Sequence, residues 1–377
     1  MAVGSFLNDA STEMMYPLLP LFLTKVLGAS VGFVGVIEGV AESTASIAKL
    51  ISGWYSDRIR ARKSMTVAGY SLSGLTKPLV AAAWRPWVVL VARFTDRVGK
   101  GVRTSPRDAL LAASVDSKSR AKAFGFHRAF DNGGAFVGPA LAMLFLWLKP
   151  GDYRFVFWMA CIPTVLSVLV LWAWMREIPV EAKGSAERPR LAWSALDPNF
   201  RVYLIVVFIF TLGNSSDAFL LLRAENLGVR DAMLPLLWIV LNLVKTLTNI
   251  PGGGLADKWG RRKVIIVGWT VYALVYAGFA VAGKDWHAWA LFATYGLYFG
   301  MTEGAERALV ADMAPEETRG TAYGFFNLAV GVAALPASVL FGYLWKALGV
   351  RVAFGVGAGL ALLAAVMMLL LVKPVRR

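Results

Sequence analysis

A short motif occurs twice in this chain, and it constrains the fold more than any other feature. The first copy spans Gly53–Arg58, the second spans Gly253–Lys258, and both follow the pattern Gly-x-x-x-Asp-[Arg/Lys]. Each copy lies where an apolar run ends and a basic stretch begins. The identical spacing indicates that the chain consists of two halves built on one plan.

The apolar runs predict a protein that crosses a membrane many times. Of the 377 residues, 57% are hydrophobic and only 17% are charged, whereas a soluble domain carries about a quarter charged residues. Runs long enough to cross about 30 Å of hydrocarbon recur along the whole length. We expect an all-α polytopic membrane protein with twelve transmembrane helices, at residues 5–25, 31–56, 64–83, 87–112, 120–148, 153–174, 200–222, 232–256, 264–282, 286–311, 318–348 and 352–372.

The distribution of Lys and Arg residues predicts the orientation in the membrane. If odd-numbered spans run outward, 19 basic residues fall in the inner loops and 8 in the outer loops. The positive-inside rule then places both termini in the cytoplasm of a multi-pass protein of the plasma (inner) membrane. The same rule accounts for most of the net charge of +15, so we do not expect a nucleic-acid partner.

One polar linker divides the chain near its middle. It covers Glu177–Pro198 and contains three prolines and one glycine among its charged residues. We expect an N-terminal six-helix bundle at 1–175, a cytoplasmic linker at 176–199 and a C-terminal six-helix bundle at 200–377. Other segments repeat between the halves as well: Pro106–Ala113 with Ala305–Asp312, and Arg120–Gly125 with Arg319–Gly324.

The sequence offers little for enzymatic chemistry. The single cysteine, Cys161, and two histidines are too few for a disulfide framework or a zinc cluster. We find no nucleophile set, no metal set and no nucleotide-binding loop. We therefore expect a protein that is not an enzyme, is monomeric, and has no catalytic residues, cofactor or metal.

The unusual residues are charges within the spans. An ionisable side chain at membrane depth is costly unless it is paired or hydrated, so such residues usually line a cavity. At 100° per residue, several cations of the fourth span share one face. The candidates for substrate binding are Tyr16, Glu42, Arg93, Arg97, Lys100, Asn242 and Lys245. The candidates for proton coupling are Asp9, Glu13, Glu38, Glu42, Asp96, His127 and Asp131.

Two interpretations of these charges are open at this point. In the first, they form internal ion pairs that hold the N-terminal bundle together, such as Glu42 with Lys49 or Arg93, and Asp131 with Arg97. In the second, the cations of the fourth span face an anionic substrate, and one or two carboxylates take up protons. His127 is either the hydrogen-bonded partner of Asp131 or a solvated side chain near the end of the fifth span.

These motifs resemble the major facilitator superfamily, and the resemblance covers the whole chain. In that family the duplicated motif latches the cytoplasmic gate, which implies a gate role for Gly53, Asp57, Arg58, Arg62, Gly253, Asp257, Lys258 and Arg261. The segment Asp96–Leu110, of pattern DRxGKGxRxxPRDAL, looks like a signature of a poorly characterised prokaryotic permease branch. Arg93 lies where the family has a fourth-helix arginine implicated in proton transfer. Gly134, Gly138 and Pro139 resemble the family's antiporter motif, although its trailing Gly-Gly is replaced by Ala142-Met143.

The resemblance implies a secondary transporter that works by alternating access, in which two repeats move around a site at mid-membrane. We expect proton-coupled export of an organic anion or a metal chelate, with membrane lipids as further partners. The alternatives are a broad drug/proton antiporter and an uncoupled facilitator or importer. A receptor is disfavoured because the longest polar stretch, Glu177–Pro198, is short.

Overall fold

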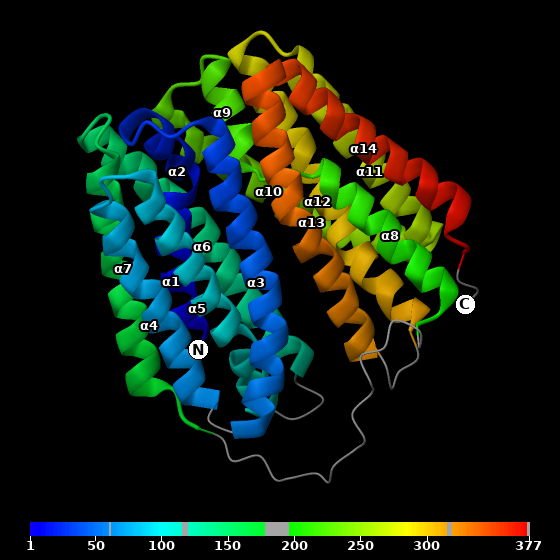
Figure 1. Ribbon diagram of the computed structural model, residues 1–377. Helices are drawn as coiled ribbons and strands as arrows, with labels where there is room; N and C mark the ends of the chain where they lie inside the picture. Colours follow the sequence, from blue (N-terminus) through cyan, green and yellow to red (C-terminus); the bar gives the residue numbers. More distant parts are fainter. Residues whose placement is uncertain (60–61, 115–119, 178–195, 315–318, 375–377) are drawn as a thin grey trace. The chain divides into compact units, whose positions relative to one another are not determined.

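The computed structural model describes residues 1–59, 62–114, 120–177, 196–314 and 319–374. Within its helices, it does not describe the side chains at 49–50, 53–59, 105, 109, 112–113, 120–126, 128–129 and 319–321. Every described element is a helix, as Figure 1 shows. The expected all-α fold is confirmed, and its helices gather into two compact units.

The first unit comprises Met1–Ser30, Val40–Lys183 and Arg230–Ile239. Its elements are α1 (Ala2–Met15), η1 (Tyr16–Leu18), α2 (Leu19–Leu21), η2 (Phe22–Val26), most of α3 (Val31–Ile59), α4 (Arg62–Ala81), α5 (Pro86–Ala113), α6 (Arg120–Leu148), α7 (Tyr153–Trp174), η5 (Asp231–Met233) and the beginning of α10 (Leu234–Trp259).

The second unit comprises Val31–Gly39, Gly184–Val229 and Val240–Arg377. Its elements are the beginning of α3, then α8 (Pro198–Gly213), α9 (Ala218–Asn226), the rest of α10, α11 (Arg261–Val281), α12 (Asp285–Met313), α13 (Arg319–Leu348) and α14 (Val350–Leu371). Two helices, α3 and α10, therefore contribute residues to both units.

The first membrane-length segment of each sequence half is interrupted. In the N-terminal half, the α-helix changes to a 3-10 turn at Tyr16–Leu18, where Pro17 removes a backbone donor. In the C-terminal half, α8 ends at Gly213 and α9 begins at Ala218, with Asn214 outside helical geometry at φ −94° and ψ 83°. Interrupted segments at corresponding positions of two repeats are typical of transporter binding sites.

Small residues let the helices of the first unit approach closely. A Cβ atom built on Gly134 of α6 would lie 2.7 Å from the carbonyl oxygen of Phe6, and one on Gly138 would collide with the carbonyl oxygen of Ala10. The hydroxyl of Ser11 donates to the carbonyl oxygen of Ala160 at 2.6 Å, which ties α1 to α7. The antiporter-like glycines thus have a packing role: they seat α6 against α1.

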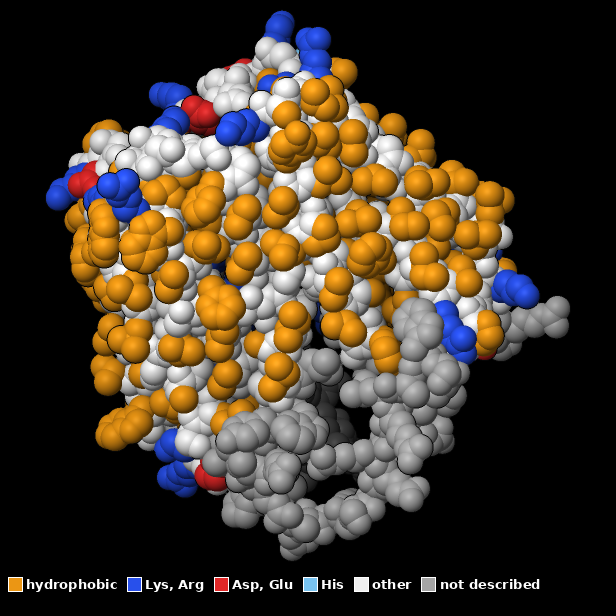
Figure 2. All heavy atoms as spheres, viewed as in Figure 1, with side chains coloured by type: hydrophobic (Ala, Val, Ile, Leu, Met, Phe, Trp, Pro, Cys, Tyr) orange, Lys and Arg blue, Asp and Glu red, His pale blue; other side chains and the backbone are white. Residues whose placement is uncertain are grey.

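Eight described helical segments are long and apolar enough to cross a membrane by length and composition. The other membrane-length segments of the described residues are α1 to η2, α4, α5 and α12. These four carry the charged residues described below, or are divided by prolines, so their average hydropathy falls. On the face shown in Figure 2, hydrophobic side chains cover the middle of the helices, and most Lys and Arg side chains gather near the helix ends.

Candidate functional site

The charged face of α5 is buried inside the first unit. Arg93, Asp96, Arg97 and Arg103 are each exposed by only 5–6%. Pro86 starts this helix at a position where its missing N–H is not needed. Helix α5 carries these three arginines and one carboxylate in the interior of the unit, where each charge requires a partner.

Lys77 of α4 is the partner of Asp96, and the sequence analysis missed it. Its Nζ lies 3.8 Å from Oδ1 of Asp96 and donates to the hydroxyl of Thr12 on α1 at 3.1 Å. The side chain is 5% exposed. A lysine in the middle of the apolar run 65–83 was the available signal. This contact joins α1, α4 and α5 at one point.

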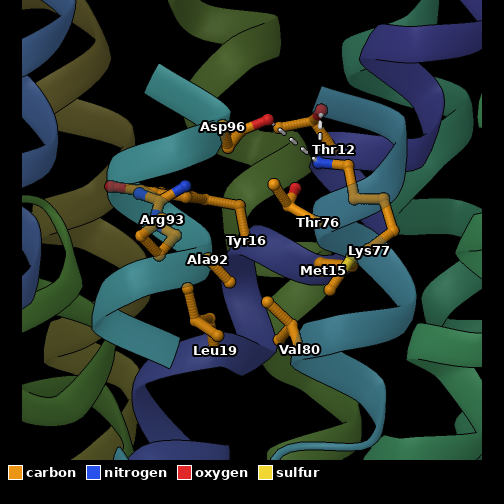
Figure 3. A pocket seen from close by; sticks show the side chains of 10 residues that line it. All are labelled: Thr12, Met15, Tyr16, Leu19, Thr76, Lys77, Val80, Ala92, Arg93 and Asp96. Atoms are coloured by element: carbon orange, nitrogen blue, oxygen red, sulfur yellow. Dashed lines mark hydrogen bonds and ion pairs between the residues drawn. The ribbon is translucent and has the colours of Figure 1, made fainter. Parts of the chain in front are cut away.

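A small cavity of about 20 Å³ lies beside this pair. Figure 3 shows Thr12, Lys77 and Asp96 converging at one side of it, and Arg93 and Tyr16 at the other. Such a volume holds about one water molecule, provided that polar partners are present. The cavity is therefore suited to a bridging water and is too small for an organic substrate.

Tyr16, at the interruption of the first segment, lies in an aromatic and charged cluster. The guanidinium carbon of Arg93 lies 5.8 Å from the centroid of the Tyr16 ring, and the centroid of the Trp238 ring lies 4.9 Å from that of Tyr16. The indole N–H of Trp238 donates to Oε2 of Glu13 at 2.7 Å. Two expected site residues, Glu13 and Tyr16, are thus held together by Trp238, which the sequence analysis did not select.

Arg97 and Glu42 form an ion pair of unequal exposure. Nη2 of Arg97 lies 3.5 Å from Oε1 of Glu42, and the exposed fractions of the two side chains are 6% and 54%. Glu42 was expected to pair with Arg93 or Lys49 if its role were structural; the described pair is with Arg97. The side chain of Lys49 lies outside the described residues.

The remaining cations of α5 contact polar groups near one end of the unit. Arg103 donates to the hydroxyl of Ser73 at 2.7 Å and lies 4.3 Å from the Tyr70 ring centroid. Arg107 pairs with Asp108 at 2.9 Å and donates to Ser5 at 3.2 Å. Lys100, three residues before Arg103 on α5, is half-buried.

His127 and Asp131 of α6 form a pair, with Nδ1 3.4 Å from Oδ2, in agreement with one of the two interpretations of His127. His127 is 3% exposed, so it is not the solvated side chain of the alternative interpretation. Asp9 of α1 accepts from the side-chain amide of Asn8 at 3.3 Å. The expected proton-coupling candidates of the N-terminal half, apart from Glu38, therefore all lie in the first unit.

The second unit holds fewer charges, and most of those described have identified partners. Nζ of Lys245 lies 3.0 Å from Oε2 of Glu303 and 4.7 Å from the Phe299 ring centroid. Asn242 lies three residues before Lys245 on α10. The carboxylate of Asp217 accepts from Tyr295 at 2.7 Å, beside the interruption between α8 and α9.

Glu38 belongs to the second unit, because the beginning of α3 packs there. The hydroxyl of Ser216 donates to its Oε2 at 3.5 Å. Close packing holds this part of α3 in place: a Cβ atom on Gly39 would lie 2.9 Å from the Cα of Leu335 on α13. Glu38 is 3% exposed, and it lies in the part of α3 that belongs to the second unit.

The second copy of the duplicated motif is described in full. Gly253 and Asp257 lie on the last turns of α10, and Gly260 turns the chain with φ +90°. Arg261 pairs with Asp312 and donates to the carbonyl oxygen of Ala308, both on α12. An open pocket of about 400 Å³ lies over this loop, and Lys258 is among its lining residues.

The first copy is described only in part. The side chains of Gly53, Asp57 and Arg58 lie outside the described residues. The backbone N–H of Arg62 donates to Oε1 of Glu177 at 3.1 Å. Among the side chains that the structure describes, no three His, Cys, Asp or Glu residues come together as a metal site would require.

Comparison with other proteins agrees with this architecture. The profile of the Major Facilitator Superfamily matches residues 1–223 and 204–377. An uncharacterised MFS-type transporter of Methanocaldococcus jannaschii is 34% identical over 372 residues, which cover 97% of this chain and 92% of that protein. The multidrug resistance protein MdtH of Photorhabdus laumondii is 27% identical over 156 residues, 41% of this chain and 38% of MdtH.

The fold is also that of solved transporters. The crystal structure of a mutant of the nucleoside transporter NupG superposes with a TM-score of 0.79 over 99% of this chain and 98% of that one, at 14% identity. At that identity the likeness concerns the fold alone. The profile match over both halves and the relative that spans nearly the whole chain establish that this protein belongs to the Major Facilitator Superfamily.

Proposed function

We propose that this transporter moves a small charged molecule by alternating access, and that it exports an organic anion or a metal chelate in exchange for protons. The observation that carries the proposal is the buried charged face of α5, where three arginines are 5–6% exposed. A scaffold needs few desolvated charges, because hydrophobic replacements are often as stable as buried ion pairs. So many charges at membrane depth favour a functional role.

The proposed substrate site lies in the first unit. Arg93, Arg97 and Lys100 supply positive charge, Glu42 supplies a carboxylate, and Tyr16 supplies an aromatic face. In the second unit, Asn242 and Lys245 are the proposed contacts. Arginine suits a carboxylate or phosphate because its planar fork binds both oxygens at once.

Proton coupling is assigned to carboxylates that lie close to these cations. Glu13, Asp96 and Asp131 each contact a donor in the first unit: Trp238, Lys77 and His127. Protonation of such a carboxylate would release its donor, and that exchange is what couples a proton to a change of conformation. Asp9, Glu38, Glu42 and His127 remain further candidates of the same kind.

The export direction is supported by two features. The antiporter-like residues Gly134, Gly138 and Pro139 lie on α6, and MdtH, a partial relative, is named for multidrug resistance. A broad drug/proton antiporter is the second candidate function for the same reason. The cations of α5 favour the anion exporter over it, because a lipophilic cation would meet like charge there.

Everted membrane vesicles test the proposal directly. Respiration acidifies the lumen, which quenches a fluorescent weak base, and a substrate exchanged for lumenal protons reverses the quench. We expect reversal with organic acids or metal chelates, and none in vesicles without the protein. Reversal with lipophilic cations alone would select the drug antiporter instead. Uptake of substrate without any reversal would replace coupled export with an uncoupled facilitator.

We further propose that the transporter is a monomer in the plasma (inner) membrane with both termini in the cytoplasm. The bias of basic residues toward one set of loops supports this orientation. The basic residues of the duplicated motif, such as Lys258, are the proposed contacts for lipid headgroups. The gate role of Asp57 and Asp257 rests on the family resemblance of that motif.

A further inference from the structure

In the pair Arg97–Glu42, the carboxylate is far more exposed than the guanidinium. The Glu42 side chain is 54% exposed and the Arg97 side chain only 6%. An exposed carboxylate at membrane depth needs water or a polar ligand beside it, because contact with lipid is too costly. A molecule that reaches this position therefore meets a carboxylate first, although the helix behind it carries arginines.

The ion pair is long enough for a ligand to replace one of its members. Its closest distance is 3.5 Å, longer than the roughly 2.8 Å of a charge-assisted hydrogen bond. Arg93 lies one turn before Arg97 on α5, about 6 Å away along the helix axis. Arg93 lies over the Tyr16 ring, and the Trp238 ring packs against Tyr16 with its centroid 4.9 Å away. A cation, a carboxylate and an aromatic wall thus lie within the reach of one small molecule.

We infer that the substrate is a zwitterion: its ammonium group binds Glu42, its carboxylate binds Arg97, and its apolar part lies against Tyr16 and Trp238. This inference rests on the proposed function and narrows the substrate class of the same site. Binding replaces one internal ion pair with two intermolecular pairs, and the charge within the site stays the same.

Molecules with a single charge fit this site less well. An anion that binds Arg97 must approach the negative charge of Glu42. A cation that binds Glu42 must approach the positive charge of Arg97. A molecule that carries both charges meets an opposite charge at each of the two side chains, so the site disfavours the other two classes by repulsion.

Three probes of matched size separate these classes: phenylalanine, 2-phenylethylamine and 3-phenylpropanoate. They share the ring and differ in which charged groups they carry. Binding to the purified full-length protein is measured by the shift of the melting curve and by calorimetry. We expect phenylalanine to bind at least about tenfold more tightly than either singly charged probe.

Two variants should change the preference in opposite directions. Glu42→Gln removes the site for the ammonium group, so the preference should move from phenylalanine to 3-phenylpropanoate. Arg97→Gln should move it to 2-phenylethylamine. Asp285→Asn, an exposed carboxylate in the first turn of α12, is the matched control and should leave all three affinities unchanged. Melting curves without probe establish that each variant is folded, and Glu42→Gln is the safer variant because its side chain is half exposed.

The outcomes separate this inference from the function on which it rests. Wild-type protein that binds only 3-phenylpropanoate, with no effect of Glu42→Gln, would overturn the zwitterion and keep an anion transporter. Binding of 2-phenylethylamine alone would overturn the zwitterion and favour the drug antiporter. No response to any of the three probes would also count against the inference, while proton exchange in everted vesicles would still support the proposed function.

Discussion

Neutralising one member of the buried pair Lys77–Asp96 should markedly lower the free energy of unfolding. The two residues are 5% and 6% exposed, and Nζ lies 3.8 Å from Oδ1. Lys77→Met keeps the length of the side chain and leaves the Asp96 carboxylate buried without its lysine. Breaking a buried pair from one side costs about 3–5 kcal/mol. We expect a loss of about 3 kcal/mol in the free energy of unfolding, at the low end of that range, because the pair is long.

A double-mutant cycle with Asp96→Asn measures this coupling. Unfolding is followed in detergent micelles by denaturant titration. The double variant should be more stable than the sum of the two single losses predicts, because it removes both buried charges. The matched control is Lys25→Met, whose partner Asp231 lies at an exposed position, with side chains 39% and 31% exposed; it should lose less than about 1 kcal/mol. Additive losses, or a Lys77→Met variant no less stable than the control, would refute the reasoning.

Three further outcomes follow from packing, hydrogen bonding and topology. Gly138→Leu should prevent α6 from approaching α1 and cost about 3 kcal/mol or more, seen as loss of the folded peak in size-exclusion chromatography; a normal peak would contradict the packing. Trp238→Phe keeps the ring but removes the donor to Glu13, so it should cost about 1–3 kcal/mol, whereas Trp286→Phe, at a side chain exposed by 58%, should have no effect; equal melting temperatures for the two variants would show that the hydrogen bond is unimportant. A cysteine at Lys373 should be labelled only from the cytoplasm and one at Lys149 only from outside, and the reverse pattern would overturn the orientation.

The helices could be predicted from the sequence because the thickness of the membrane hydrocarbon sets the length of each apolar run. The expected span at 153–174 coincides with α7, Tyr153–Trp174. The interruption at Tyr16–Leu18 has a local cause in Pro17, which the sequence displays. The interruption after Gly213 contains no proline, and only the polar run Asn214–Asp217 marks it.

The partners of the buried charges could not be read in the same way. Helical phase shows which residues of one helix share a face, but the choice of partner depends on the rotation and depth of the neighbouring helix. Thus the pair His127–Asp131, four residues apart on one helix, was among the alternatives that the sequence offered. The pair Arg97–Glu42, between two helices, was not. Lys77 was missed because an isolated lysine in an apolar run gives no periodic signal.

Substrate-dependent proton flux through the purified protein is the most direct test of the account. The protein is reconstituted into liposomes that contain a pH-sensitive dye, and the substrate is added under an imposed pH gradient. The account predicts a proton flux that needs both the protein and the substrate. The double variant Arg97→Gln with Glu42→Gln, which removes both charges of the ion pair, should lower that flux at least about tenfold at an unchanged melting temperature. A flux equal to that of empty liposomes, or full flux in the folded double variant, would contradict the claim that the charges around α5 carry coupled transport.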